Sequence, residues 1–146
     1  MSLEENKAIV RRFVEAYNKG NLDLLDDLVA PDYFDHTHQL SPEGLKQVIN
    51  MALKAFPDYH EAIEDIIAEG DKVWVRIKAT GTHTGEFMGL APTGKKIKMM
   101  FADMFRIVNG KLVEYWEVRD QLDFLKQLGL IEYTEKGKKL FPEDVK

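Results

Sequence analysis

The sequence predicts an α+β domain in which a helical half is followed by an antiparallel sheet. Apolar residues recur at helical spacing up to Pro57, whereas from Tyr59 onward they alternate with polar residues. Asn109-Gly110 is a strong hairpin signal between two alternating segments. Three helices over one face of a strongly bent sheet would form a cone with an open mouth, a shape that can hold a pocket.

Each expected helix has its own start or stop signal. Ser2 and Glu5 resemble a capping box, and Gly20 is a typical helix end. Ser41 followed by Pro42 is a typical helix start. The expected helices span residues 2–20, 22–29 and 41–56, and residues 32–38 are expected to be irregular.

Four strands are expected over residues 59–69, 72–84, 96–108 and 112–120, and a short helix over 121–129. In the second strand Val73 and Val75 occupy one face, with Trp74 and Arg76 on the other. We therefore expect one domain over residues 1–130 and a charged, loosely structured tail over residues 131–146.

Composition excludes several classes of protein. The chain has 146 residues, enough for one domain with a core, and its net charge of −5 does not favour nucleic acid. It has no cysteine, which excludes disulfides and thiolate nucleophiles. No apolar run is long enough to span a membrane, and the acidic N-terminus lacks the features of a signal peptide. We expect a cytoplasmic protein that binds neither nucleic acid nor membrane.

Asp120 is the first candidate for chemistry. Trp116, Val118 and Asp120 would share one face of a regular strand. A carboxylate sheltered beside a tryptophan would be suited to proton transfer near neutral pH. Alternatively, Asp120 caps the helix that begins at the next residue, because Asp is a preferred N-cap. The residues alone leave both interpretations open.

Several segments resemble one known family when they are taken together. They run from Phe13-Val14-Glu15-Ala16-Tyr17-Asn18-Lys19-Gly20-Asn21 through Phe56-Pro57-Asp58, Glu69-Gly70-Asp71-Lys72-Val73, Gly81-Thr82-His83-Thr84-Gly85-Glu86-Phe87, Pro92-Thr93-Gly94-Lys95 and Asn109-Gly110-Lys111-Leu112-Val113-Glu114-Tyr115-Trp116 to Asp120 and Gln127-Leu128-Gly129. In this order they resemble the SnoaL-like polyketide cyclases, within the NTF2-like fold of a cone-shaped α+β barrel. Tyr115 differs, because a histidine is common there in the family.

The resemblance implies a reaction and a catalytic residue. Family cyclases close a ring by an intramolecular aldol condensation without metal or cofactor, using an aspartate that follows the tryptophan of the last strand. Asp120 is the matching position. Related isomerisations would use the same proton transfers, and a non-catalytic protein that binds a small hydrophobic ligand is the alternative. Apolar residues on both strand faces favour a homodimer in either case.

Other residues of the sequence are candidates to act together with Asp120. An enolate oxygen needs a hydrogen-bond donor, for which His36, His83 and Arg76 are candidates. His36 and His38 have the spacing of some metal sites, but no third ligand is in register, so no metal site is expected. Arg76 and Asp103 each interrupt an apolar strand, and they would form either a pair lining the cavity or an ion pair on the outer face. The candidate substrate-binding residues are Phe13, Tyr17, Phe56, Trp74, Arg76, Phe101, Asp103, Met104 and Trp116.

Overall fold

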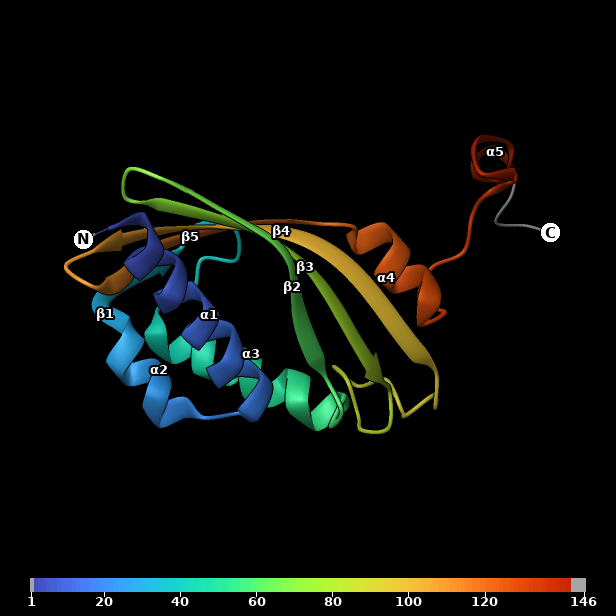
Figure 1. Cartoon of the computed structure of the whole chain (residues 1–146). Coiled ribbons are helices and arrows are strands. Elements are labelled where there is room, and N and C mark those ends of the chain that lie inside the picture. The colour runs from blue at the N-terminus through green and yellow to red at the C-terminus, as the bar shows by residue number, and fades with distance from the viewer. Residues whose placement is uncertain (1, 143–146) are drawn as a thin grey trace.

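The computed structural model describes residues 2–142. Its helices are α1 (Leu3–Lys19), α2 (Leu22–Leu28), α3 (Pro42–Ala55), α4 (Gln121–Gln127) and α5 (Glu135–Leu140). Its strands are β1 (Val29–Asp35), β2 (His60–Glu69), β3 (Lys72–Thr82), β4 (Lys96–Val108) and β5 (Lys111–Arg119). They form one sheet in the order β1-β5-β4-β3-β2. The sheet is strongly bent, and α1, α2 and α3 all lie on one side of it (Figure 1).

The predicted helix signals are confirmed. The Ser2 hydroxyl accepts a hydrogen bond from the Glu5 backbone N–H at 3.0 Å, and the Ser41 hydroxyl caps α3 in the same way. Gly20 ends α1 in the left-handed conformation, with φ of 63°, which glycine adopts without steric cost. Helix starts and stops are local signals, so the sequence alone places them well.

The prediction of an irregular segment over residues 32–38 is wrong for its first part. The chain passes from α2 directly into β1, which pairs in parallel with β5 through Val29–Leu112 and Asp35–Tyr115. β1 lies at the edge of the sheet, where Pro31 is tolerated. The pairing partner is about 80 residues away in the sequence, so no local pattern announces this strand. The pairing places Asp35 beside the inner face of β5.

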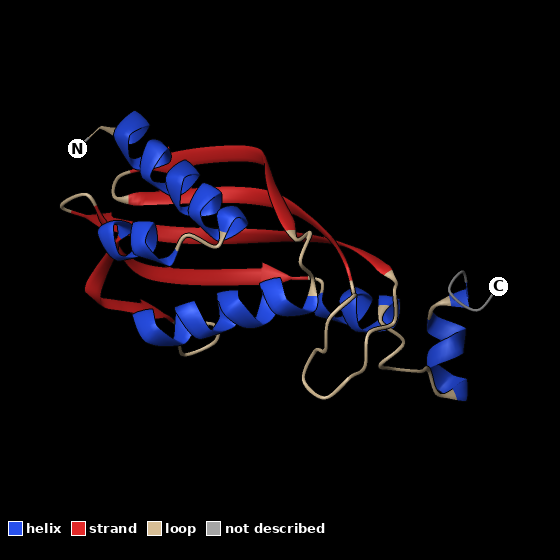
Figure 2. Cartoon of the chain, turned by 90° about the horizontal axis from the view of Figure 1, so that it is seen from below, coloured by secondary structure: helices blue, strands red, loops and turns tan. Residues whose placement is uncertain are grey.

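The two faces of the sheet differ in burial. In β3 and β4 alternate residues are buried under the helices, and the residues between them face outward. Figure 2 shows the helices covering the inner face. At its centre Phe105 makes edge contacts with Phe13 and Tyr115, with ring centroids 5.4 and 5.2 Å apart. This inner face is therefore the core side on which a site can be sheltered.

The C-terminal segment is partly helical, which differs from the expected loose tail. Residues 135–140, expected to be loose, form α5, which stands clear of the body (Figure 1). The division into a domain and a tail at residue 130 stays a prediction. Over residues 2–142, none of the helices combines the length and the apolar character needed to cross a bilayer.

Candidate functional site

Several charged side chains lie inside the core. Asp103 on β4 and Glu117 on β5 are paired neighbours on the inner face, and the side chain of Arg119 follows on the same face of β5. Glu61 on β2 and Asp35 at the end of β1 are also buried. Asp103, Glu117, Glu61 and Asp35 are 3, 8, 7 and 2% exposed. Burying charge is costly unless it is paired or neutralised, so each of these groups needs a physical account.

Glu117 is held as an ionised carboxylate. The Arg119 guanidinium donates a hydrogen bond to Oε1, and the Tyr115 hydroxyl donates one to Oε2 at 2.7 Å. Burial by itself would raise the pKa of Glu117, but Arg119 and Tyr115 together outweigh it and hold that pKa below its usual range. Arg119 also lies 5.5 Å from the centre of the Phe101 ring. Glu117 is therefore a charged acceptor inside the protein.

Asp103 has the opposite character. Burial, and next the negative charges of Glu117 and Glu61, raise the pKa of Asp103 well above its usual range. Its carboxyl therefore ionises less readily than that of Glu117. Among residues 2–142, neither Asp103 Oδ1 nor the hydroxyl of Tyr33 has a hydrogen-bond partner. Buried polar atoms without partners are rare, so these two atoms stand out within the cluster.

The loop after β1 closes one side of the cluster. Asp35 Oδ1 accepts hydrogen bonds from the backbone N–H groups of Thr37 and His38, at 2.8 and 2.9 Å. Glu117 N–H donates to the Thr37 hydroxyl at 2.8 Å. The His38 ring lies 2.9 Å from Asp35 Oδ2 and 3.6 Å from Glu117 Oε1. His38 thus connects the buried carboxylates to the surface.

Glu61 is the third member of the cluster. Its backbone exchanges two hydrogen bonds with the Asn18 side chain, at 2.7 and 2.9 Å, and its carboxyl accepts one from the Tyr59 hydroxyl at 2.8 Å. Burial, together with the charge of Glu117, raises the pKa of Glu61 to about 7, although the Tyr59 bond opposes the rise. Glu61 therefore changes charge near neutral pH.

This gives a testable pH dependence for Glu61→Gln. The pKa of Glu61 is raised in the folded state, so its contribution to stability is present below about pH 4.5 and is lost as pH rises through about 7. A Gln side chain does not ionise, so the variant does not lose stability as pH rises through this range. We expect the variant to gain about 2 kcal/mol relative to the parent between pH 5 and pH 8, measured by urea unfolding. A pH-independent difference would contradict the assignment.

Comparison with known proteins identifies the family. The model of the SnoaL-like polyketide cyclase family matches residues 7–128, which is most of the chain. The chain belongs to the SnoaL-like polyketide cyclase family.

Relatives of this SnoaL-like chain include two methyl ester cyclases. Aklanonic acid methyl ester cyclase DauD of Streptomyces sp. (strain C5) is 32% identical over 129 residues, which cover 83% of this chain and 80% of DauD. Nogalonic acid methyl ester cyclase of Streptomyces nogalater is 27% identical, over 80% of this chain and 91% of the relative.

Solved structures have the same fold. AclR, a proposed hydroxylase of Streptomyces galilaeus, is 34% identical with a TM-score of 0.82, over 90% of this chain and all of AclR. TsrD of Streptomyces laurentii is 25% identical with the same TM-score, over 90% of this chain and 99% of TsrD. The NTF2-like cone predicted from the sequence is confirmed by these structures.

The position that the family resemblance selected is not sheltered. Asp120 is exposed, and its carboxylate caps α4 by accepting a hydrogen bond from the Asp123 N–H at 3.0 Å. Trp116 and Val118 face the outer side of the sheet, and Val118 is 73% exposed. The expectation of a buried Asp120 is therefore wrong, and the alternative of a helix cap is confirmed. The acidic residue that directly follows Trp116, Glu117, points inward instead.

The predicted binding residues divide between the two faces of the sheet. Phe13, Tyr17, Phe56, Phe101 and Asp103 lie on the core side. Trp74, Arg76, Met104 and Trp116 lie on the outer side and do not join them. Arg76 and Asp103 are on opposite faces, so neither version of the expected ion pair forms; Arg76 is instead the register partner of Asp65.

The two candidate histidines are also apart from the cluster. His36 stacks on Trp116, with ring centroids 4.7 Å apart, and is 2.6 Å from Glu114. His83 is fully buried against Phe56, and its Nδ1 accepts a hydrogen bond from the Thr93 N–H at 3.2 Å. Both histidines therefore have structural partners, at the outer face and at the end of β3.

Sequence reasoning missed most of the buried cluster. The missed residues are Asp35, His38, Tyr59, Glu61, Tyr115, Glu117 and Arg119, with Tyr33. One signal was available. Tyr115, Glu117 and Arg119 are alternate residues of β5, so they point to the face opposite to that of Trp116 and Val118. Which of these two sets is buried depends on the face of the sheet that the helices cover, and the sequence pattern leaves that open.

Proposed function

We propose that this protein is a cofactor-free cyclase that acts on a small polyketide with two carbonyl groups. The observation that carries the proposal is the pair of buried register neighbours Glu117 and Asp103, whose pKa values are shifted in opposite directions by Arg119 and by burial. Neighbouring carboxyls with separated pKa values are the arrangement that divides base and acid roles at one pH. In this proposal Glu117 is the base and Asp103 the hydrogen-bond donor.

The proposed steps conserve atoms and charge. Glu117 removes a proton from the carbon next to a carbonyl, and the resulting enolate oxygen accepts a hydrogen bond from Asp103. The enolate carbon attacks a second carbonyl of the same molecule, which closes the ring. Protonated Glu117 then returns the proton to the new alkoxide. The product is an isomer of the substrate, and one carboxylate serves both proton transfers.

The surroundings support an aromatic, largely apolar substrate. Phe13, Tyr17 and Phe101 lie on the inner side next to the cluster. The relatives named above are cyclases of aklanonic and nogalonic acid methyl esters. We propose a substrate of the same chemical kind, the methyl ester of a polyketide acid.

Product analysis tests the proposed reaction. The protein is incubated with aklanonic acid methyl ester and separately with nogalonic acid methyl ester, and products are examined by chromatography and mass spectrometry. We expect a new compound of unchanged mass from at least one of them. Gain of an oxygen atom would favour hydroxylation, as proposed for AclR, and tight binding without conversion would favour the non-catalytic alternative. Either result would overturn the cyclase proposal.

We also propose a homodimer formed through the outer face of the sheet. Ile67, Trp74, Met100 and Val118 are exposed there, and Trp74, Met104 and Trp116 are neighbours across β3, β4 and β5. A continuous apolar patch of this kind is typical of an interface. Light scattering after gel filtration should give twice the mass of the chain; a monomer at about 100 μM would contradict the dimer. The cytoplasmic location stays a prediction.

A further inference from the structure

The C-terminal arm, residues 131–142, projects from the body. It contains α5, and it rises on the outer side of the sheet, opposite to α1, α2 and α3 (Figure 1). Leu140 is 77% exposed and Phe141 is also exposed. Phe141 stacks on Tyr133 with ring centroids 4.9 Å apart, which gives the arm an ordered apolar part of its own. An ordered element that leaves apolar side chains in solvent indicates a surface made for contact.

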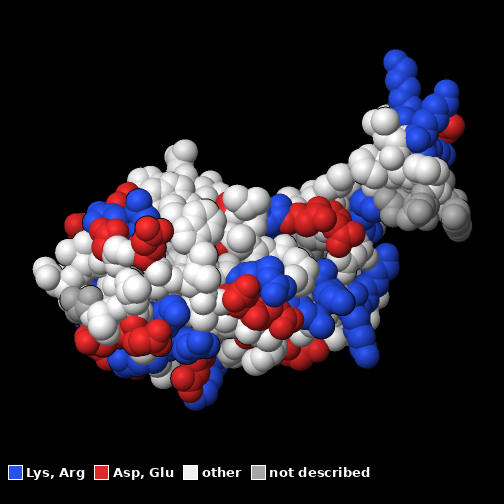
Figure 3. All heavy atoms as spheres, turned by 45° about the horizontal axis from the view of Figure 1, so that its top comes forward, with Lys and Arg blue, Asp and Glu red and all other residues white. Residues whose placement is uncertain are grey.

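The charges of the arm complement one edge of the sheet. Lys136, Lys138 and Lys139 give α5 a basic character, and they stand out at the end of the arm in Figure 3. β2, an edge strand, carries the exposed acidic residues Glu64, Asp65 and Glu69. Next to them Ile67 and Trp74 line an apolar groove together with Asp65 and Arg76. The groove thus offers apolar surface, with Asp65 and Arg76 in its lining and further acidic residues along β2 beside it.

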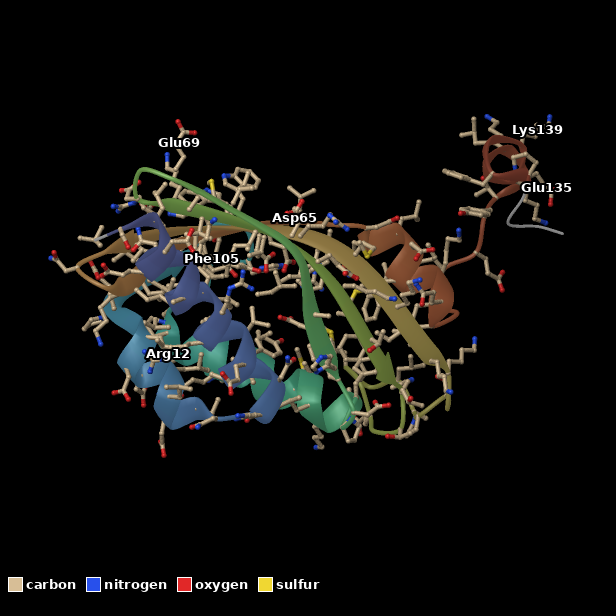
Figure 4. The ribbon with its side chains drawn as sticks, in the orientation of Figure 1. Arg12, Asp65, Glu69, Phe105, Glu135 and Lys139 are labelled. Carbon is tan, nitrogen blue, oxygen red and sulfur yellow. The ribbon has the colours of Figure 1, made fainter. Side chains whose placement is uncertain are left out.

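The arm cannot reach this groove in its own chain. Asp65, which lines the groove, lies near the middle of the sheet, whereas Lys139 lies at the far end of the projecting arm (Figure 4). The segment between α4 and α5 is short, and the Lys126 ammonium lies 5.3 Å from the Tyr133 ring, which ties the start of the arm to α4. A second copy facing this sheet would bring its own groove within reach of the arm.

We propose that the arm of each copy packs on the outer face of the other copy, with Leu140 and Phe141 in the groove beside Ile67 and Trp74, and with the α5 lysines next to Asp65 and Glu69. This inference rests on the homodimer proposed above and goes beyond it, because it assigns a role to the arm. The exchanged arms would cover the exposed Trp74 and Ile67 and strengthen the dimer.

Crosslinking tests the contact directly, since the chain has no cysteine of its own. The double variant Leu140→Cys with Ile67→Cys is treated with a short bismaleimide. We expect a covalent dimer on a denaturing gel. The matched control pairs Leu140→Cys with Met88→Cys, because Met88 is 78% exposed but lies in the loop between β3 and β4. Equal or weaker crosslinking of the Ile67 pair compared with this control would overturn the proposal.

Charge reversal provides a second readout. We expect Lys138→Glu with Lys139→Glu to raise the dissociation constant of the dimer about tenfold, and Asp65→Lys with Glu69→Lys to restore it in the same chain. Lys7→Glu with Lys19→Glu changes the net charge equally on α1 and should have little effect. A change below threefold, or no rescue, overturns the arm contact. A full-length chain that is monomeric overturns the dimer and the arm contact together, whereas a dimer without the crosslink overturns the arm contact alone.

Discussion

Replacing Glu117 with Gln should lower turnover by about 10²–10⁴-fold while the fold is retained. Gln has nearly the same shape, and its amide oxygen can still accept the hydrogen bond from Arg119 while its NH₂ group donates to the Tyr115 hydroxyl, but it cannot take up and return a proton. The loss should therefore appear in kcat rather than in KM. The measurement is steady-state cyclisation of the substrate identified by the product analysis, with circular dichroism and urea unfolding of the same preparation.

Asp120→Asn is the matched control for this prediction. Asn is as good an N-cap as Asp, so α4 should keep its start and the protein its stability. We expect activity within about twofold of the parent, because Asp120 is at the surface. If Asp120→Asn abolishes turnover while Glu117→Gln is active, the acid/base role belongs to the position selected by the family resemblance, and the assignment to Glu117 is wrong.

Replacing Arg119 with Leu should lower the free energy of unfolding by about 3–5 kcal/mol at pH 8. The change leaves the Glu117 carboxylate buried without its cation, and breaking a buried pair from one side has an effect of this size. In the parent, the lowered pKa of Glu117 stabilises the fold above about pH 4.5, and this contribution disappears as pH falls. In the variant, burial of Glu117 dominates, so its ionisation becomes unfavourable as pH rises.

The difference between parent and Arg119→Leu should therefore shrink as pH falls, because the unpaired Glu117 of the variant takes up a proton, whereas Glu117 of the parent stays ionised down to its lowered pKa. Urea unfolding at pH 8 and pH 4.5 measures it. The double variant Arg119→Leu with Glu117→Gln should recover part of the loss at pH 8, because no charge is then left unpaired. A loss that is independent of pH and is not relieved by Glu117→Gln would show that Arg119 acts through packing on Phe101 rather than through charge.

Much of the fold could be predicted because its signals are local. The caps at Ser2 and Ser41 and the end of α1 at Gly20 each depend on hydrogen bonds within a few residues. The hairpin at Asn109-Gly110 also depends on local conformation, since both residues have positive φ, at 50° and 77°. β1 was missed because the hydrogen bonds that make it a strand come from β5, far along the chain.

The candidate site could be predicted less well, for a reason visible at Trp116. The sequence directed attention to a carboxylate near this tryptophan, but it could not show which side of the sheet the tryptophan faces. Trp116 faces outward, so its neighbour Glu117 is buried and Asp120 caps a helix at the surface. A shift of one residue along a strand exchanges the core face for the solvent face.

By itself, the sequence determined the order of α1 to α4 and of β2 to β5, the α+β class and the family, because periodicity, caps and turns are properties of short segments. Only the tertiary structure decided which acidic groups share the interior. Asp35, Glu61, Asp103 and Glu117 come from four different strands and meet through the register of the sheet and the side that the helices cover. The opposite pKa shifts of Asp103 and Glu117 follow from that burial and from the Arg119 guanidinium placed beside Glu117.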